Sequence, residues 1–376
     1  MRICITIVLY SVAASAICGN TQQHDSSKVH EQDLQINQLQ YIGTHNSYHA
    51  GLAPSIAKVL QQKAPDVYTT LDYIHPDLSA QFDEGVRQIE LDVYADAKGG
   101  RYAHPIGPQI AEKMGIPHDS LAETGPEMLR PGFKVMHIQD IDFRSTCQPF
   151  TACLREVRDW SEKHPQHLPI FILIETKEEV ETKEIPMTVP EPYTVDALNA
   201  LEDEILSVFR PDQIITPDSV RGHYATLENA ILHHGWPSVS SSRGKIMFMF
   251  LNENIRKNYL TGHPSLRGRT LFTNAKPGQA DAAFIDRSGE DMSDVASLVK
   301  RGYMVRVRAD ADTIEARKND YHRCNIAFQS GAQFISTDYP VNEPARWTGY
   351  TVSFAGDMVA RVNPVSASEP LPAESR

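Results

Sequence analysis

The stretch Ile170-Phe171-Ile172-Leu173-Ile174, followed by Glu175, is apolar on both faces of an extended strand. A strand with one wet face alternates apolar and polar residues, whereas a strand of a parallel sheet covered by helices does not. The stretch from Pro169 to Glu175 therefore predicts a buried parallel strand. Other strand-like runs are Leu39 to Thr44, Gln88 to Val93, Phe133 to Ile138, Lys245 to Phe250, Ala283 to Asp286 with Leu271 to Thr273 as its competitor, Tyr303 to Arg308 and Phe334 to Asp338.

Helical patterns stand between these runs. We expect helices at Pro76 to Glu84, Cys153 to Lys163, Val195 to Phe209, Ser293 to Arg301 and Thr313 to Ser330. Eight buried strands that alternate with helices predict the α/β class and a single (β/α)8 TIM-type barrel, regular or distorted. In that fold the loops that leave the carboxyl ends of the strands carry the chemistry.

The composition sets the class and the domain organisation. The chain has 376 residues, 41% hydrophobic and 22% charged, which is near the average of globular proteins and excludes a disordered or fibrous chain. The net charge of −12 has the wrong sign for a protein whose main partner is a nucleic acid. Because no linker or repeat interrupts the middle of the chain, we expect one domain over residues 36–363, after a flexible lead-in over 20–35 and before a disordered tail over 364–376.

The N-terminus is typical of an export signal. Met1-Arg2 is followed by an apolar run from Ile3 to Val12 and by the small residues Ala14-Ser15-Ala16. We therefore expect a signal peptide over residues 1–19 and a secreted protein, extracellular or periplasmic. The alternative is a short membrane anchor, but the run is too short to cross a hydrocarbon core of about 30 Å.

Three cysteines would remain after removal of the signal: Cys147, Cys153 and Cys324. Cys147 and Cys153 are close enough in sequence to close one small disulfide loop in an exported protein, and we expect Cys324 to be buried elsewhere. Three buried thiols are the alternative.

Polar side chains gather at the ends of the first four predicted strands. His45 and Asn46 follow the first strand, Glu90 and Asp92 lie two apart on the second, and His137 and Glu175 end the third and fourth. Two carboxylates on the same face of a strand repel each other, so a cation or a shared proton is needed to hold them there. With Asn46 and Glu175 added to these two carboxylates, the set offers only oxygen donors, which favours Ca²⁺ or Mg²⁺ over zinc.

These residues resemble the catalytic barrel of the calcium-dependent phosphoinositide-specific phospholipases C. Thr44-His45-Asn46-Ser47-Tyr48, Glu90-Leu91-Asp92, His137 and Glu175 occur in the order of that family, and longer phrases such as Met136-His137-Ile138-Gln139-Asp140-Ile141-Asp142 and Ser336-Thr337-Asp338-Tyr339 are similar to its compact secreted bacterial branch. The resemblance implies that His45 and His137 are the catalytic pair. It also implies that Asn46, Glu90, Asp92 and Glu175 bind Ca²⁺, because the calcium-independent relatives place a basic residue where this chain keeps two acids.

The reaction implied by the resemblance is cleavage of phosphatidylinositol at a membrane surface by a monomeric enzyme. The inositol 2-hydroxyl would attack the phosphodiester, giving diacylglycerol and a cyclic inositol phosphate that is then opened more slowly. A carboxylate, Glu90 or Glu175, would take the hydroxyl proton, His45 would donate hydrogen bonds at the phosphorus and His137 would protonate the departing oxygen.

Further residues are candidates for binding the phosphate or the inositol. They are Lys177, two residues after Glu175, and Arg306 and Arg308, which share one face of the seventh strand. The alternative is that this face points outward into ion pairs. His75 is either a residue that supports the acid–base pair or a cap and packing residue. The long segments Ala103 to Arg130 and Thr176 to Tyr193 either contact a lipid surface or are ordered loops that do not contact lipid.

Two other functions remain open from the sequence. A glycerophosphodiester phosphodiesterase also uses a barrel, two histidines and a Glu-x-Asp pair, but it normally opens with a His-Arg-Gly phrase that Gly43-Thr44-His45-Asn46 does not match. A secreted calcium or inositol-lipid binder without turnover would have no need of an acid and a base at neighbouring strand ends.

Overall fold

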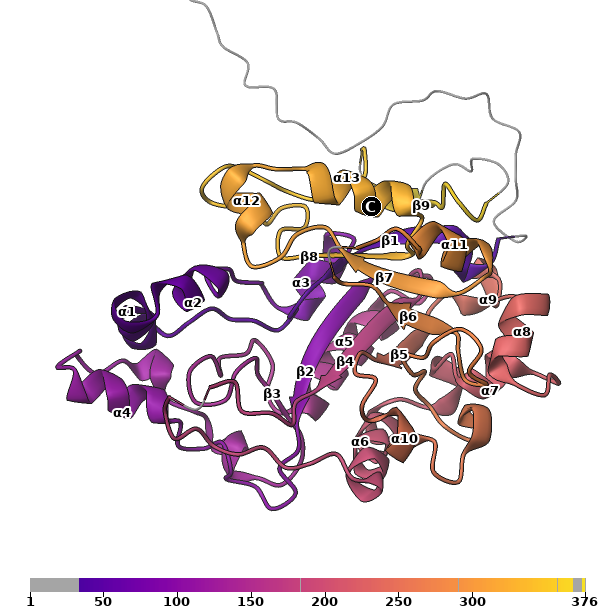
Figure 1. The fold of residues 1–376 in the computed structure, drawn as a ribbon. Coiled ribbons are helices and arrows are strands. Elements are labelled where there is room, and N and C mark those ends of the chain that lie inside the picture. Colours follow the sequence, from indigo (N-terminus) through magenta and orange to yellow (C-terminus); the bar gives the residue numbers. More distant parts are fainter. Residues whose placement is uncertain (1–33, 183, 290, 357, 368–373, 376) are drawn as a thin grey trace, which may run out of the picture.

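A nearly closed parallel barrel forms the centre of the protein (Figure 1). The computed structural model describes residues 34–182, 184–289, 291–356, 358–367 and 374–375, so the predicted signal peptide and most of the predicted lead-in lie outside the described residues. Seven parallel strands pair in the order β5-β4-β2-β1-β8-β7-β6. They are β1 (Leu39–Thr44), β2 (Gln88–Tyr94), β4 (Ile170–Thr176), β5 (Ile246–Phe250), β6 (Phe284–Asp286), β7 (Met304–Arg308) and β8 (Phe334–Thr337). The predicted α/β barrel is confirmed.

The space between β5 and β6 is bridged by the short segment around Phe272. Met249 of β5 forms a parallel bridge with Phe272, and Asn274 forms another with Phe284 of β6. Leu271 to Thr273 therefore does not compete with β6 for one place in the barrel. Both segments contribute, side by side.

The predicted third strand, Phe133 to Ile138, is wrong in direction and length. The structure has only β3 (Lys134–Val135), and it pairs antiparallel with Val93 and Tyr94 of β2. A parallel pairing would need a crossover that returns the chain to the start of β2. Instead α4 (Ile106–Lys113) packs beside α1 (Pro54–Lys63) and the chain comes back at the same end of the barrel.

The helices agree with the sequence except at their ends and at one break. The predicted helix Thr313 to Ser330 is divided because Asn319 takes a left-handed conformation, φ 55°. The α-helices are α1, α2 (Pro65–Thr70), α3 (Leu78–Asp83), α4, α5 (Phe150–Lys163), α6 (Val195–Val208), α7 (Pro217–Arg221), α8 (Leu227–His233), α9 (Val239–Ser242), α10 (Arg256–Tyr259), α11 (Val295–Lys300), α12 (Ile314–Lys318) and α13 (His322–Ser330).

The chain segments at both ends of the barrel domain pack on it. Leu34 is buried, and β9 (Met358–Val362) pairs antiparallel with the start of β1. The sequence predicts a disordered tail over 364–376, whereas Ser366 Oγ donates to the carbonyl of Asn37 (3.2 Å) and β10 (Glu374–Ser375) pairs with β9. The described parts of this tail are thus held against the barrel by backbone pairing.

The cysteines and the lengths of the helices were also open from the sequence. Cys147 and Cys153 form a disulfide, as the first of the two alternatives predicts, and Cys324 is buried. Within the described residues, no helix is both long and apolar enough to span a bilayer.

The barrel interior is apolar at one end and polar at the other. Tyr41, Phe171 and Phe334 contact one another, with ring centroids 4.6–6.2 Å apart, and fill the end at which the strands begin. Above them Gln88 lies across the interior, where a Cβ on Gly43 would come within 2.0 Å of its side chain. Because side chains of a strand alternate, the same face of β2 continues upward from Gln88 to Glu90 and Asp92.

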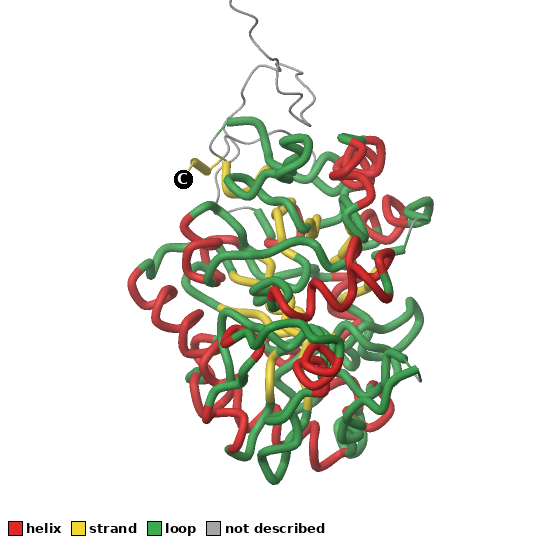
Figure 2. The backbone as a smooth tube through the Cα atoms, turned by 90° about the vertical axis from the view of Figure 1, so that its left-hand side faces the viewer, coloured by secondary structure: helices red, strands yellow, loops and turns green. Residues whose placement is uncertain are grey.

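The long loops gather at the polar end. α1 and α2 follow β1, α4 follows β2, and all three lie together at the left of Figure 1. Figure 2 looks onto that side and shows loops, turns and short helices in front of the strands. This arrangement surrounds the carboxyl ends of β1, β2 and β4 with polypeptide from several loops.

Candidate active site

The turn after β1 carries His45 and Asn46 and is clamped onto β2. The amide of Ser47 donates to the carbonyl of Glu90 (3.0 Å), and the amide of Glu90 donates to Ser47 Oγ (2.8 Å). Asn46 takes a left-handed conformation, φ 46°, which asparagine tolerates better than most residues. The clamp therefore places His45 and Asn46 beside the carboxylates of β2.

Glu90, Asp92 and Glu175 form an acidic cluster. One carboxylate oxygen of each residue lies within 4.8 Å of the others, because β2 and β4 pair in the register that sets Asp92 against Glu175. Burial raises the pKa of Asp92 well above its usual range, and repulsion from Glu175 raises it further. Burial also raises the pKa of Glu90 to about 7, although Arg306 opposes the change.

The cluster has the donors that a calcium ion requires. Neither carboxylate oxygen of Asp92 accepts a hydrogen bond within the described part of the chain, although the side chain is fully buried. Asn46 Nδ2 donates to the Tyr73 hydroxyl (2.8 Å), which leaves Asn46 Oδ1 on the side of Tyr48 and the acidic cluster. Carboxylate and amide oxygens suit Ca²⁺, and a divalent ion would remove the repulsion between the three acids.

Lys177 lies against this cluster. Its Nζ is 3.5 Å from Asp92 Oδ2 and 3.3 Å from Glu175 Oε1. Burial alone would lower the pKa of Lys177, but Asp92 and Glu175 raise it above its usual range. The predicted substrate-binding lysine is thus held as a counter-ion of the acids.

His45 is paired with Asp338 at the end of β8. His45 Nδ1 lies 2.8 Å from Asp338 Oδ1, and Arg308 Nη2 donates to Asp338 Oδ2 (2.9 Å). Burial and the positive charge of Arg308 hold the pKa of His45 well below its usual value, against the opposing effect of Asp338. His45 is therefore neutral at neutral pH in this structure.

Both predicted arginines of β7 point into the barrel, so the alternative of an outward face is wrong. Arg306 is buried and donates to Glu90 (2.5 Å), Asp286 (3.2 Å) and Ser336 (3.0 Å). Each nitrogen of its guanidinium thus has a partner. Arg308 differs, because its buried Nε has no hydrogen-bond partner among the described residues.

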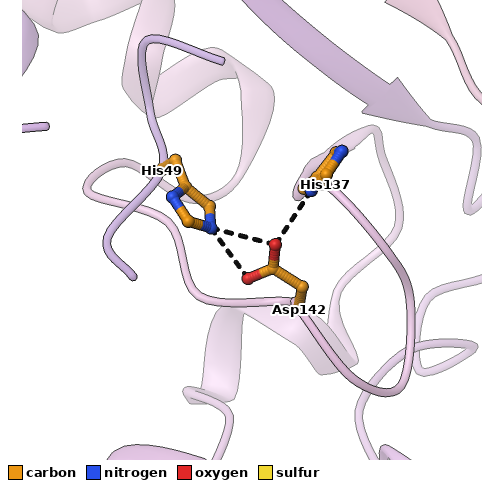
Figure 3. Close-up of side chains that lie close together, drawn as sticks. All are labelled: His49, His137 and Asp142. Carbon is orange, nitrogen blue, oxygen red and sulfur yellow. Dashed lines mark hydrogen bonds and ion pairs between the residues drawn. The ribbon is translucent and has the colours of Figure 1, made fainter. Parts of the chain in front are cut away.

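His137 lies in the loop after β3 and is paired with Asp142 (Figure 3). His137 Nδ1 is 2.8 Å from Asp142 Oδ2, and His49 Nε2 is 2.9 Å from both oxygens of the same carboxylate. The Tyr94 hydroxyl donates to the carbonyl of His137 (2.9 Å) and holds its backbone next to β2. His137 thus reaches the polar end of the barrel from a loop instead of a strand.

Comparisons with known proteins identify the family of the chain. The family model described as phosphoinositide phospholipase C, Ca²⁺-dependent, matches residues 34–364. The chain belongs to this family. It is therefore a phosphoric diester hydrolase of the phosphoinositide-specific phospholipase C type, with Ca²⁺ as cofactor, and the phosphodiesterase and non-catalytic alternatives are set aside.

A solved bacterial structure shows the same fold, and a second match is weaker. A calcium-dependent phosphoinositol-specific phospholipase C from a Gram-negative Pseudomonas sp. matches in an apo crystal form and in a myo-inositol complex, each at 15% identity and a TM-score of 0.51 over 85% of this chain and 95% of that chain. The Ca²⁺-dependent phosphatidylinositol-specific phospholipase C from Streptomyces antibioticus matches at 17% identity and a TM-score of 0.48 over 81% and 95%. Among curated proteins, no relative matches the chain.

His75 contacts the backbone of His45 and does not enter the phospholipase C site. Its Nε2 donates to the carbonyl of His45 (3.0 Å) and its Nδ1 to Glu343 Oε2 (2.6 Å). Burial would lower the pKa of His75, but the hydrogen bond and charge of Glu343 raise it above its usual value. With an acceptor at each ring nitrogen, His75 carries both protons and supports the turn that holds His45.

Sequence reasoning missed three residues of this site. Asp338 and Asp142 both occur in phrases that resemble the phospholipase C family, but the sequence pattern predicts no role for them or for His49. His49 stands four residues after His45, so its proximity in sequence was the available signal. The pairing of Asp142 depends on how its loop closes, which the sequence pattern does not show.

Proposed function

We propose that this phospholipase C cleaves phosphatidylinositol to diacylglycerol and a cyclic inositol phosphate. The observation that carries the proposal is the pair His45 and His137, each backed by a buried aspartate, at the same end of the barrel as the acidic cluster. A phosphodiester exchange needs one group that takes a proton from the attacking hydroxyl and another that gives a proton to the leaving oxygen. Two histidines and three acids supply these groups.

The calcium ligands in this proposal are Asn46, Glu90, Asp92 and Glu175. When bound, Ca²⁺ supplies positive charge that favours ionisation of the inositol 2-hydroxyl and offsets charge that grows on the phosphate. Arg306 holds Glu90 in its position from across the barrel, and Lys177 holds Asp92 and Glu175 from the loop side.

The residues of the chain then divide the proton transfers. The bond between the inositol 2-oxygen and phosphorus forms while the bond between phosphorus and the glycerol oxygen breaks. Glu90 or Glu175 takes the proton of the 2-hydroxyl, and His137 gives a proton from Nε2 to the glycerol oxygen. In the slower second step water enters and the two transfers run in reverse, which opens the cyclic phosphate and restores the enzyme.

His45 and the basic residues bind the phosphate in this proposal. His45 uses Nε2, because its Nδ1 is occupied by Asp338. Arg308 contributes the Nε that has no partner among the described residues. Arg306 and Lys177 remain candidates for substrate contact, but their present ion pairs make Arg308 the stronger one.

The membrane-facing surface is the rim formed by the loops after β1, β2 and β4. Ile74, Leu129 and Val189 are 62%, 59% and 64% exposed there, and Val67 and Leu121 are exposed on the same set of loops. Apolar side chains at the mouth of the site favour contact with a lipid surface. The net charge of −12 makes strong electrostatic attraction to anionic lipid unfavourable, so we expect weak and transient contact.

The protein is proposed to act as a secreted monomer. The Cys147–Cys153 disulfide supports an oxidising compartment.

The test is phosphorus NMR of purified protein with phosphatidylinositol, in Ca²⁺ or in a chelator, beside a glycerophosphodiester control. A cyclic inositol phosphate formed only with Ca²⁺ supports the proposal. Cleavage of the control alone, or an acyclic phosphate with no cyclic intermediate, would contradict it.

A further inference from the structure

Asp142 lies between two histidines that come from different loops (Figure 3). His49 is supplied by the loop after β1, whereas His137 and Asp142 belong to the loop after β3. Asp142 and His49 are completely buried, and the side chain of His137 is 19% exposed. A buried carboxylate with two histidine partners is more than a packing residue, because each contact restricts a ring that titrates near neutral pH.

The charge of Asp142 decides where the histidine protons are. Burial would raise the pKa of Asp142, but the facing His49 and the hydrogen bonds from His137 and His49 hold it below its usual range. An ionised carboxylate can only accept hydrogen bonds. His49 must therefore carry hydrogen on Nε2, and His137 must carry hydrogen on Nδ1.

The two histidines differ in what their other nitrogen can do. His49 Nδ1 is buried and has no hydrogen-bond partner among the described residues, so the polar contact of this ring is the one that Nε2 makes with Asp142. The other ring nitrogen of His137 points away from Asp142 (Figure 3) and belongs to a partly exposed side chain. Only His137 can therefore exchange a proton with a bound molecule.

The loop and the His49 ring are both fixed by neighbours. Backbone hydrogen bonds between Ile138 and Asp142 run in both directions (3.0 and 2.8 Å) and close the loop that carries the carboxylate. The amide of His49 donates to the carbonyl of Asn46 (2.8 Å), and its carbonyl accepts from the amide of His75 (2.9 Å). Its ring packs at a tilt of 33° against Tyr73, with centroids 4.4 Å apart. These contacts fix the position of the His49 ring, so its Nε2 donates to Asp142 from one defined place.

We propose that His49 and Asp142 are a positioning pair for His137. His49 holds the carboxylate of Asp142 in one orientation, and Asp142 keeps hydrogen on Nδ1 of His137, so that Nε2 faces the leaving oxygen. The role of His137 as proton donor rests on the proposed function. The three residues also have the donor types of a zinc site, but contacts of 2.8–2.9 Å are direct hydrogen bonds that leave no space for an ion between them.

Variants at His49 separate positioning from packing. His49→Gln keeps an amide donor near the place of Nε2, whereas His49→Leu keeps bulk and removes the donor. We expect His49→Leu to lower kcat about 10-fold and Asp142→Asn to lower it about 10- to 100-fold with KM nearly unchanged, and we expect His49→Gln to stay within about 3-fold of the wild type. Ser161→Ala is the matched control, because it removes a hydrogen bond of another buried histidine, His167 (2.7 Å), at the opposite end of the barrel.

A spectroscopic readout tests the same claim without turnover. In protein labelled with ¹⁵N-histidine, the His137 signals are those that His137→Ala removes. We expect hydrogen on Nδ1 of His137 in the wild type and on Nε2 in Asp142→Asn, because an asparagine amide can donate to Nδ1. A wild-type spectrum with hydrogen on Nε2 and none on Nδ1 would contradict the proposal, and so would equal losses of kcat in His49→Gln and His49→Leu.

The outcomes also separate this inference from the proposed function. If the wild type does not cleave phosphatidylinositol but the spectra are as expected, the proposed function fails and the geometry of the pair stands. If the wild type and Asp142→Asn cleave it equally fast while His137→Ala does not, only the positioning pair fails. Should Asp142→Asn not fold, the comparison of the two His49 variants still decides.

Discussion

The two histidines of the site are backed by aspartates in different ways. His45 follows β1 and Asp338 follows β8, and these strands are neighbours in the barrel, so regular backbone pairing brings the two together. His137 and Asp142 belong to one irregular loop, and the carboxylate is shared with His49 from another loop. The first pair is therefore set by the barrel and the second by the way the loops close.

Each aspartate contacts one further residue besides its catalytic histidine. That further residue explains why the two pairs differ in chemistry. Asp338 is shared with Arg308, whose fixed positive charge holds the pKa of His45 down and favours a neutral ring that binds a phosphate. Asp142 is shared with His49, which donates a hydrogen bond from Nε2 and brings no fixed positive charge, and the same carboxylate pairs with His137. An Asp–His pair thus takes its role from what else the aspartate contacts.

Replacing either histidine has the largest expected effect. We expect His45→Ala and His137→Ala each to lower kcat on phosphatidylinositol by about 10²–10⁴-fold, the usual scale for a lost acid–base group. His118→Ala is the control, since His118 lies on an exposed loop and pairs with the exposed Glu123. Near-full activity of either variant in a vesicle assay would contradict the catalytic role of the histidine that it lacks.

Asp338→Asn tests the pair of His45 and Asp338, which the neighbouring strands β1 and β8 bring together. It removes the partner of His45 and leaves the buried Arg308 without its nearest counter-ion. We expect kcat to fall about 10- to 100-fold, and the free energy of unfolding in urea to fall by about 3 kcal/mol. Asp142→Asn leaves no buried arginine unpaired, so a loss of stability as large as that of Asp338→Asn would contradict the distinction between the two pairs.

Asp92→Asn tests the acidic cluster as the proposed calcium site. The change removes one buried charge that repels Glu90 and Glu175, so we expect the calcium-free protein to gain about 1 kcal/mol and Ca²⁺ affinity to fall at least about 10-fold. Thermal melts with and without Ca²⁺, together with calorimetric titration, measure both effects. Unchanged Ca²⁺ affinity would place the ion elsewhere.

The exposed apolar rim has a smaller predicted effect. Val189→Ser and Ile74→Ser should raise KM on phosphatidylinositol vesicles by about 3-fold each, because each removes apolar area that meets lipid, and should not change kcat on a soluble inositol phosphodiester. Leu232→Ser, at an exposed position on α8, is the matched control. Equal changes in the three variants would argue against a lipid-facing rim.

The smallest predicted effects are on the free energy of unfolding. The pH dependence of this free energy has opposite signs at two buried histidines, His75 and His167. The pKa of His75 is raised, so its stabilisation is present below about pH 6.5 and is lost as pH rises through its folded value. The pKa of His167 is lowered to about 4 by burial, so the wild type loses stability as pH falls below about 6.5.

Urea unfolding of His75→Gln and His167→Gln against the wild type measures these effects. We expect the deficit of His75→Gln to shrink between pH 6 and pH 9, and the deficit of His167→Gln to shrink by about 1 kcal/mol between pH 7.5 and pH 5.5. A pH-independent deficit at His75 would remove it as a charged support of the His45 turn.

Sequence patterns predicted the barrel because its strands are fully apolar runs, such as Ile170 to Ile174, whose burial needs no knowledge of their partners. They did not predict the direction of the segment from Phe133 to Ile138. Its apolar residues would suit either direction, and the outcome depends on where the chain returns after α4. The bridge around Phe272 was too short for periodicity to separate it from β6.

The residues of the site also fall into those that the sequence predicts and those that it does not. His45, Glu90, Asp92 and Glu175 lie at or beside strand ends, where position along the strand predicts the face. Asp338 lies 293 residues from His45 in sequence, and no local pattern joins them. Asp142 and His49 meet only through the closed loop after β3, and the inward direction of Arg306 depends on its contact with Glu90 across the barrel.

The most direct test of the account is to vary the leaving group. A soluble inositol phosphodiester with 4-nitrophenol in place of diacylglycerol needs little proton donation, so a variant that lacks only the proton donor should recover on it. We predict that His137→Ala regains most of the wild-type kcat on this substrate, whereas His45→Ala stays about 10²-fold or more below it. Equal recovery of the two variants, or recovery of His45→Ala alone, would contradict the division of roles between the two histidines.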